Sequence, residues 1–173
     1  MVTVASVVIC LFILPTRLPG MELLGVAPNW LLIWVVSWSI SRNIWQGAIA
    51  GLALGLIQDG MTFYEPTHTF SLILAGVITS RLQKQRYVQE DFISVALIVF
   101  GMAVVTETIT AVQFSIESFA NSAHRAYPTL AEIWFEYQRI ALSSAILSSL
   151  WAPVIYYPLN RWWEWVRFMD QRS

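Results

Sequence analysis

Long stretches with few or no charged side chains dominate this sequence of 173 residues. A helix needs about 20 consecutive apolar residues to cross the hydrocarbon core of a bilayer, so such stretches are typical of membrane spans. We predict an all-α integral membrane protein, a single domain over residues 1–173 built as a bundle of six transmembrane helices. The predicted spans cover about residues 2–16, 26–41, 44–60, 67–82, 92–114 and 138–158.

The composition excludes most other classes of protein. Only 12% of the residues are charged, about half the share found in soluble domains. The formal net charge of −1 leaves no polybasic surface for nucleic acid, and a single cysteine, Cys10, cannot form an internal disulfide. Residues 1–16 lack the basic region and the cleavage site of a secretory signal, so we expect them to be retained as the first span.

Basic residues predict how the spans face, because cytoplasmic loops carry an excess of Lys and Arg. Seven basic residues follow the second, fourth and sixth segments, against three on the opposite side. This distribution predicts that both termini lie in the cytoplasm. The larger group comprises Arg42, Arg81, Lys84, Arg86, Arg161, Arg167 and Arg172, and the smaller one Arg17, Arg125 and Arg139.

Tryptophan is frequent, with nine residues, and most of them fall at predicted span ends. Indole rings prefer the headgroup level of a bilayer, so we expect membrane anchoring, most clearly at residues 162–165. Trp30, Trp34 and Trp38 also recur every four residues and form an aromatic stripe that meets either a partner helix or lipid. The tryptophans at span ends are Trp30, Trp45, Trp134, Trp162, Trp163 and Trp165.

Three glycines of the third segment, Gly47, Gly51 and Gly55, recur every four residues and therefore share one helix face. Small residues at this spacing let another helix approach closely. The face serves either packing within the bundle or contact with a partner protein. Asp59 continues the same spacing, and it is either a plain helix end in water or a polar tie to a neighbouring helix.

The second segment opens with Pro28, Asn29 and Trp30. Proline fits the first turn of a helix, and an asparagine side chain can accept hydrogen bonds from the free N–H groups there. We therefore expect a defined helix start at this point.

Glu107 is the carboxylate placed deepest in a strong predicted span. Ionised groups at that depth are costly and tend to mark function. Because Thr106, Thr108 and Thr110 lie nearby, we expect a protonated, hydrogen-bonded side chain. Proton or ligand binding and contact with a partner protein are the alternatives.

No residues with the spacing of a catalytic or metal site occur. His68 and His124 are single, without a second His or Cys at ligand spacing. Neither a Gly-x-Ser-x-Gly elbow nor a phosphate-binding loop is present. Glu132 and Glu136 share one face of a predicted short interfacial helix. We therefore expect no enzymatic activity, no cofactor and no metal.

Three short stretches carry a resemblance to a known family. They are residues 26–32, the glycine-rich span that ends at residues 55–59, and residues 150–153 followed by the basic Arg161. Their order and spacing, with the length and the six-span plan, resemble the rod shape-determining protein MreD family. In that family Pro-Asp or Pro-Asn opens the second helix, and a glycine-rich run that ends in Asp closes the third.

The resemblance implies a fold like that of the six-helix substrate-binding subunits of energy-coupling-factor transporters. It implies a non-enzymatic subunit of the bacterial elongation machinery in the inner membrane, which binds the single-span protein MreC. MreB, a RodA-type glycosyltransferase and the elongation transpeptidase would belong to the same assembly. Together with the patterns above, it gives these candidate partner-binding or helix-packing residues: Pro28, Asn29, Trp30, Gly47, Gly51, Gly55, Asp59, Glu107, Trp151 and Pro153.

Two other functions remain as alternatives. A vitamin-binding subunit of an energy-coupling-factor transporter would need a polar pocket under the outer loops, which Asp59, Glu107, Gln113 and Glu117 could supply. An enzyme acting on lipid-linked wall precursors would need an acid–base pair flanked by basic residues, and the sequence offers none.

Overall fold

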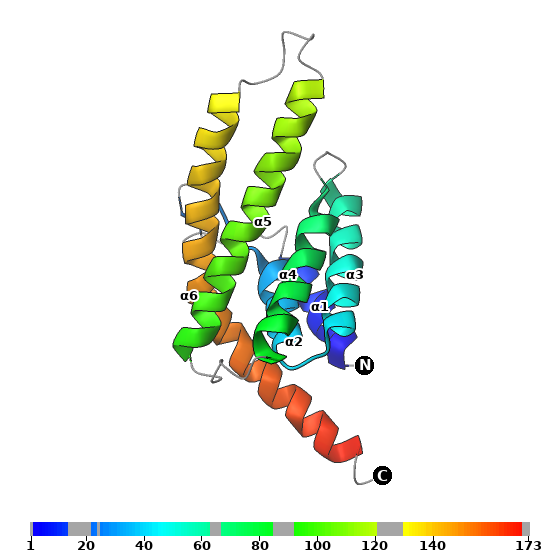
Figure 1. The fold of residues 1–173 in the computed structure, drawn as a ribbon. Coiled ribbons are helices and arrows are strands. Elements are labelled where there is room, and N and C mark those ends of the chain that lie inside the picture. Colours follow the sequence, from blue (N-terminus) through cyan, green and yellow to red (C-terminus); the bar gives the residue numbers. More distant parts are fainter. Residues whose placement is uncertain are drawn as a thin grey trace.

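The computed structural model describes residues 2–13, 22–23, 25–62, 67–84, 92–120 and 130–170 (Figure 1). Within these ranges the regular secondary structure is helical, apart from one isolated bridge between Leu23 and Val26. The helices are α1 (Val2–Ile13), α2 (Trp30–Ile40), α3 (Ile44–Thr62), α4 (His68–Lys84), α5 (Phe92–Ala120) and α6 (Leu130–Asp170). The all-α class is thus confirmed for the described residues, whereas six membrane crossings stay a prediction. Arg17, Arg86, His124, Arg125 and Arg172 lie outside the described residues.

Two of the described helices are long and apolar enough to cross a membrane, α5 over Phe92–Phe119 and α6 over Leu130–Trp165. Both exceed the predicted spans 92–114 and 138–158, because no Gly or Pro interrupts the polar extensions at residues 114–120 and 130–138. The separate interfacial helix expected around Glu132 and Glu136 is wrong, since these residues belong to the first turns of α6.

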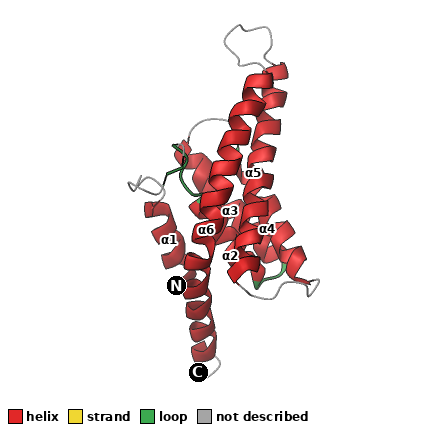
Figure 2. Cartoon of the chain, turned by 90° about the vertical axis from the view of Figure 1, so that its left-hand side faces the viewer, coloured by secondary structure: helices red, strands yellow, loops and turns green. Residues whose placement is uncertain are grey.

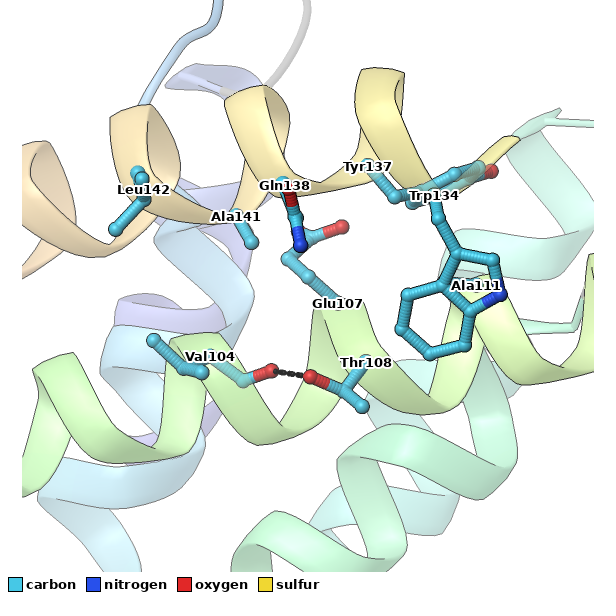
Figure 3. Close-up of a pocket in the computed structure, with 9 residues that line it drawn as sticks. All are labelled: Val104, Glu107, Thr108, Ala111, Trp134, Tyr137, Gln138, Ala141 and Leu142. Carbon is cyan, nitrogen blue, oxygen red and sulfur yellow. Dashed lines mark hydrogen bonds between the residues drawn. The ribbon is translucent and has the colours of Figure 1, made fainter. Parts of the chain in front are cut away.

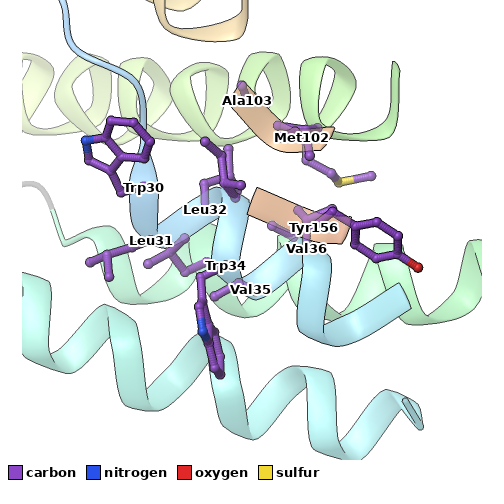
Figure 4. Close-up of a cluster of buried hydrophobic side chains, with 14 of the residues drawn as sticks. Trp30, Leu31, Leu32, Trp34, Val35, Val36, Met102, Ala103 and Tyr156 are labelled. Carbon is purple, nitrogen blue, oxygen red and sulfur yellow. The ribbon is translucent and has the colours of Figure 1, made fainter. Parts of the chain in front are cut away.

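Helix α2 forms the centre of the fold. Ten of its 11 residues are buried, and it contacts each of the other five helices. Its sequence is apolar around the whole circumference, which is typical of a helix enclosed by others. Figure 4 shows Leu32 and Val36 of α2 beside Met102 and Ala103 of α5 and Tyr156 of α6. The rest of the bundle is arranged around this short helix.

The remaining helices form two closely packed pairs, α3 with α4 and α5 with α6. Figures 1 and 2 both show α5 and α6 side by side and extending beyond the ends of α3 and α4. At 1.5 Å per residue, the 29 residues of α5 span about 43 Å, which exceeds a hydrocarbon core of about 30 Å. The α5–α6 pair is therefore the part of the fold that can extend outside a bilayer.

Helix α6 changes direction along its length, and its last turns run obliquely below the bundle (Figure 1). Pro153 and Pro158 lie inside this helix, and each removes a backbone N–H and crowds the carbonyl four residues earlier. The change of direction carries Trp163 to α2, where its ring lies edge-on to Trp34 and Trp38 at centroid distances of 6.3 and 5.0 Å.

This packing corrects part of the tryptophan prediction. Trp30 is 7% exposed and Trp163 is 5% exposed, so neither ring is an anchor at the headgroup level. Trp30 packs edge-on against Trp151 of α6, and the Trp34 indole donates a hydrogen bond to Ser6 Oγ of α1 at 3.0 Å. The stripe on α2 therefore packs against helices of the same chain. The other tryptophans predicted at span ends, Trp45, Trp134, Trp162 and Trp165, are exposed.

Candidate functional site

The glycine face of α3 lies against α4. A Cβ atom added at Gly51 would lie 2.8 Å from the Cα of Ile73 and would also meet the carbonyl of Leu72. At Gly47 it would lie 2.7 Å from the carbonyl oxygen of Gly76, and at Gly55 it would meet the backbone of Thr69. Side chains at these positions would separate the two helices, so the face serves packing within the chain in this structure.

Asp59 ties the end of α3 to the start of α4. Its carboxylate accepts hydrogen bonds from the backbone N–H groups of His68 and Thr69, at 2.6 and 3.1 Å, and from the Thr69 hydroxyl. The His68 ring nitrogen Nδ1 lies 3.2 Å from Asp59 Oδ1. A negative charge at a helix N-terminus also interacts favourably with the helix dipole. Asp59 therefore caps α4, although it comes from a different helix.

Removing this cap is expected to destabilise the α3–α4 pair. Asp59→Ala should lower the free energy of unfolding by about 1–2 kcal/mol, the usual cost of losing an N-terminal cap. Asp59→Asn should cost less, because the amide oxygen can still accept one of the backbone hydrogen bonds. The measurement is thermal unfolding of the purified protein in mild detergent, followed by circular dichroism. Glu136→Ala, which removes an exposed carboxylate 3.7 Å from Arg139, is the control, and an equal loss in both variants would contradict the capping role.

The start of α2 is fixed by Asn29. Its side chain accepts a hydrogen bond from the Leu32 N–H at 3.0 Å, and its own N–H donates to Ser148 Oγ of α6 at 2.9 Å. The helix begins at Trp30, so the expected place of Pro28 in the first turn is wrong. Pro28 precedes the cap, where its ring is buried.

Near the middle of α6, Trp151 packs against α2, and Pro153 lies two residues further along the helix. The Trp151 ring is half-buried, with its centroid 5.8 Å from that of Trp30, and Pro153 is fully buried. Neither residue contacts the glycine face. The candidate residues thus include an α2–α6 contact and an α3–α4 contact and do not form one common surface.

Glu107 projects from α5 toward α6 and borders two cavities (Figure 3). A groove of about 340 Å³ runs between these two helices, past Trp134, Tyr137 and Gln138. A second cavity of about 230 Å³ lies where the start of α2 meets the ends of α3 and α4, and it is lined in part by Gln58 and His68. Glu107 is thus the carboxylate shared by a mainly apolar groove and a polar cavity.

The threonines next to Glu107 donate their hydroxyl hydrogen bonds within α5 and not to Glu107, and a protonated Glu107 stays a prediction. The Thr106, Thr108 and Thr110 hydroxyls donate to the carbonyls of Ala103, Val104 and Thr106, respectively, within α5 itself. A threonine in a helix commonly satisfies its hydroxyl this way, because the carbonyl three or four residues earlier is within reach.

The structure differs from the pocket that the sequence suggested. Asp59 is engaged in capping α4, and Gln113 and Glu117 line neither of the two cavities around Glu107. Gln58, His68 and Ser144 line the polar cavity instead. No local pattern indicates these three residues, because they lie on three different helices and meet only through tertiary packing.

Among the described residues, no three His, Cys, Asp or Glu side chains gather in a way that could hold a metal ion.

Comparison with known proteins adds the last observation. No curated protein and no solved structure matches the chain. A family model described as rod shape-determining protein MreD matches residues 1–158.

Proposed function

The chain belongs to the rod shape-determining protein MreD family, and from this membership we propose that it helps to position peptidoglycan synthesis along the side wall of a bacterial cell. In this proposal it is a non-enzymatic, six-span subunit of the inner membrane with both termini in the cytoplasm. It binds an MreC-like single-span protein and through it joins the elongation machinery. The family match over residues 1–158 is the observation that carries the proposal.

The packing of the helices supports a choice of binding surface. The glycine face of α3 is covered by α4, so it is not available to a partner helix. By contrast, α5 carries exposed apolar residues near both of its ends. Ile93, Leu97 and Phe119 point away from the side of the helix that holds the buried residues Val95, Val99 and Met102.

Gly101 lies on this exposed side of α5, and a Cβ atom added there would meet nothing within 4 Å. A small residue in the middle of an apolar helix face allows a second helix to approach closely. We place the MreC span against this face, centred on Gly101. The last turns of α5 extend beyond α3 and α4 (Figure 1), where they can contact the part of MreC that follows its span.

The test is mild-detergent purification of the tagged chain from its native membrane, with quantification of the co-purified MreC-like protein. The unchanged chain should recover it together with wall synthases, and failure to do so would refute the proposed function. Gly101→Leu should fold normally but recover about tenfold less MreC, because a bulky side chain blocks the close approach. Gly60→Leu is the matched control, since a Cβ there also meets nothing within 4 Å but lies on α3. Equal recovery from both variants would refute the surface and leave the function standing.

A further inference from the structure

The groove between α5 and α6 has a volume of about 340 Å³ and lies on the outside of the helix pair. Its walls are mainly apolar, with Val104 and Ala111 on α5 and Ala141 and Leu142 on α6. Leu142 is 55% exposed and Trp134 is 40% exposed, so the groove opens outward from the bundle. The groove lies between the two described helices that are long and apolar enough to cross a membrane, so in a bilayer its open side would face lipid. Trp134 at one end indicates the headgroup level.

The groove contains one carboxylate without a cationic partner among the described residues. Glu107 faces Tyr137 and Gln138 of α6 within the groove (Figure 3). The cavity on its other side presents the neutral Gln58 and Ser144, together with His68, whose ring contacts Asp59. No described Lys or Arg lines either cavity. Burial without a cation favours the neutral form of a carboxylic acid, so a cation from outside the chain would stabilise Glu107 in its ionised form.

We propose that this groove binds a zwitterionic phospholipid with a primary ammonium headgroup, of the phosphatidylethanolamine type. The ammonium contacts the Glu107 carboxylate, and an acyl chain lies along the apolar wall formed by Val104 and Leu142. A primary ammonium donates three hydrogen bonds, and Glu107, Gln138 and Tyr137 all offer acceptor oxygens. A trimethylammonium headgroup donates none, and an anionic headgroup is repelled by Glu107. The inference rests on the groove and not on the proposed function.

Trp134 provides the readout, because bromine atoms on the part of a lipid acyl chain next to the headgroup quench the fluorescence of a nearby indole. The full chain is placed in phosphatidylcholine bilayers that contain increasing amounts of brominated lipid. The brominated species are phosphatidylethanolamine, its mono- and dimethyl derivatives, phosphatidylcholine and phosphatidylglycerol, all with the same acyl chains. The same measurement on Trp134→Phe gives the quenching of the other tryptophans. Subtracting it from the quenching of the unchanged chain leaves the signal of Trp134.

For the unchanged chain, we expect half-maximal quenching of Trp134 at a content of brominated phosphatidylethanolamine about tenfold lower than that of brominated phosphatidylcholine. The difference corresponds to one charge-assisted hydrogen bond between the primary ammonium and Glu107. The preference over phosphatidylcholine should fall with each methyl group added to the headgroup nitrogen. This series of lipids tests the proposal without any change in the protein. Glu107→Gln should abolish the preference, and Glu136→Gln, at an exposed carboxylate outside the groove, should retain it. Equal quenching by all headgroups, stronger quenching by phosphatidylglycerol or phosphatidylcholine, or an unchanged preference in Glu107→Gln would overturn the proposal.

Discussion

Replacing Gly51 with leucine is expected to prevent α3 and α4 from pairing and to abolish most of the yield of folded protein. A Cβ atom at Gly51 would lie 2.7 Å from the carbonyl carbon of Leu72 and 2.8 Å from the Cα of Ile73. Both neighbours are backbone atoms, so no change of rotamer can relieve the contact. Overpacking with flexible side chains already costs about 1–3 kcal/mol, and we expect a larger loss here.

The measurement is the yield of monodisperse protein after extraction, followed by thermal unfolding of whatever is recovered. Gly51→Ala should give an intermediate result, because it introduces the same Cβ without the additional bulk. Gly60→Leu tests whether leucine is harmful anywhere on α3, since nothing lies within 4 Å of a Cβ at Gly60. Normal yield and normal unfolding of Gly51→Leu would show that α4 does not pack on this face.

The close-packed face of α3 could be predicted from sequence because its glycines recur at a regular spacing. Glycines at every fourth position must share one side of a helix, whatever surrounds it. The identity of the helix on that side could not be predicted, because Gly76 and Thr69 of α4 carry no comparable repeat. The same holds for Asp59, whose place at the end of the glycine row could be read from sequence. Its hydrogen bonds to His68 and Thr69 depend on how closely α4 approaches.

The predicted segments differ most from the observed helix bounds at the short central helix α2 and at the long pair α5 and α6. The apolar run at residues 26–41 gives a helix of 11 residues over Trp30–Ile40, because Asn29 caps it and binds Ser148 of α6. Hydropathy alone cannot distinguish a helix surrounded by protein from one surrounded by lipid. Tertiary contacts therefore decide where α2 begins and that it lies at the centre.

The surroundings of Glu107 could be predicted only in part. Its apolar span could be recognised from sequence, and so could the cost of placing a carboxylate there. Its neighbours across the groove, Tyr137 and Gln138, come from the extended start of α6, which was expected to be a separate surface helix. Because that segment continues into α6, it places polar groups opposite Glu107 that no spacing along the chain indicates.

Trp163→Ala is the second substitution for which we expect a large effect, a loss of about 3–5 kcal/mol in the free energy of unfolding, as for other buried aromatic residues. The Trp163 ring is 5% exposed and lies edge-on to both Trp34 and Trp38, which stack on each other at 5.5 Å. Removing it would leave a cavity between α2 and the last turns of α6. Its indole N–H has no hydrogen-bond partner among the described residues, so Trp163→Phe should cost much less.

Trp165→Ala distinguishes packing from membrane anchoring, because Trp165 lies two residues further along α6 and is 58% exposed. If residues 162–165 acted only as an anchor at the headgroup level, neither substitution would lower the free energy of unfolding in detergent, where no bilayer interface is present. The structure predicts a large loss for Trp163→Ala and a change within about 0.5 kcal/mol for Trp165→Ala, as for other exposed positions. Unfolding of both variants in detergent therefore measures the packing contribution alone. Near-ultraviolet circular dichroism should show a loss of the tryptophan signal in Trp163→Ala only, because that ring holds Trp34 and Trp38 in a fixed geometry.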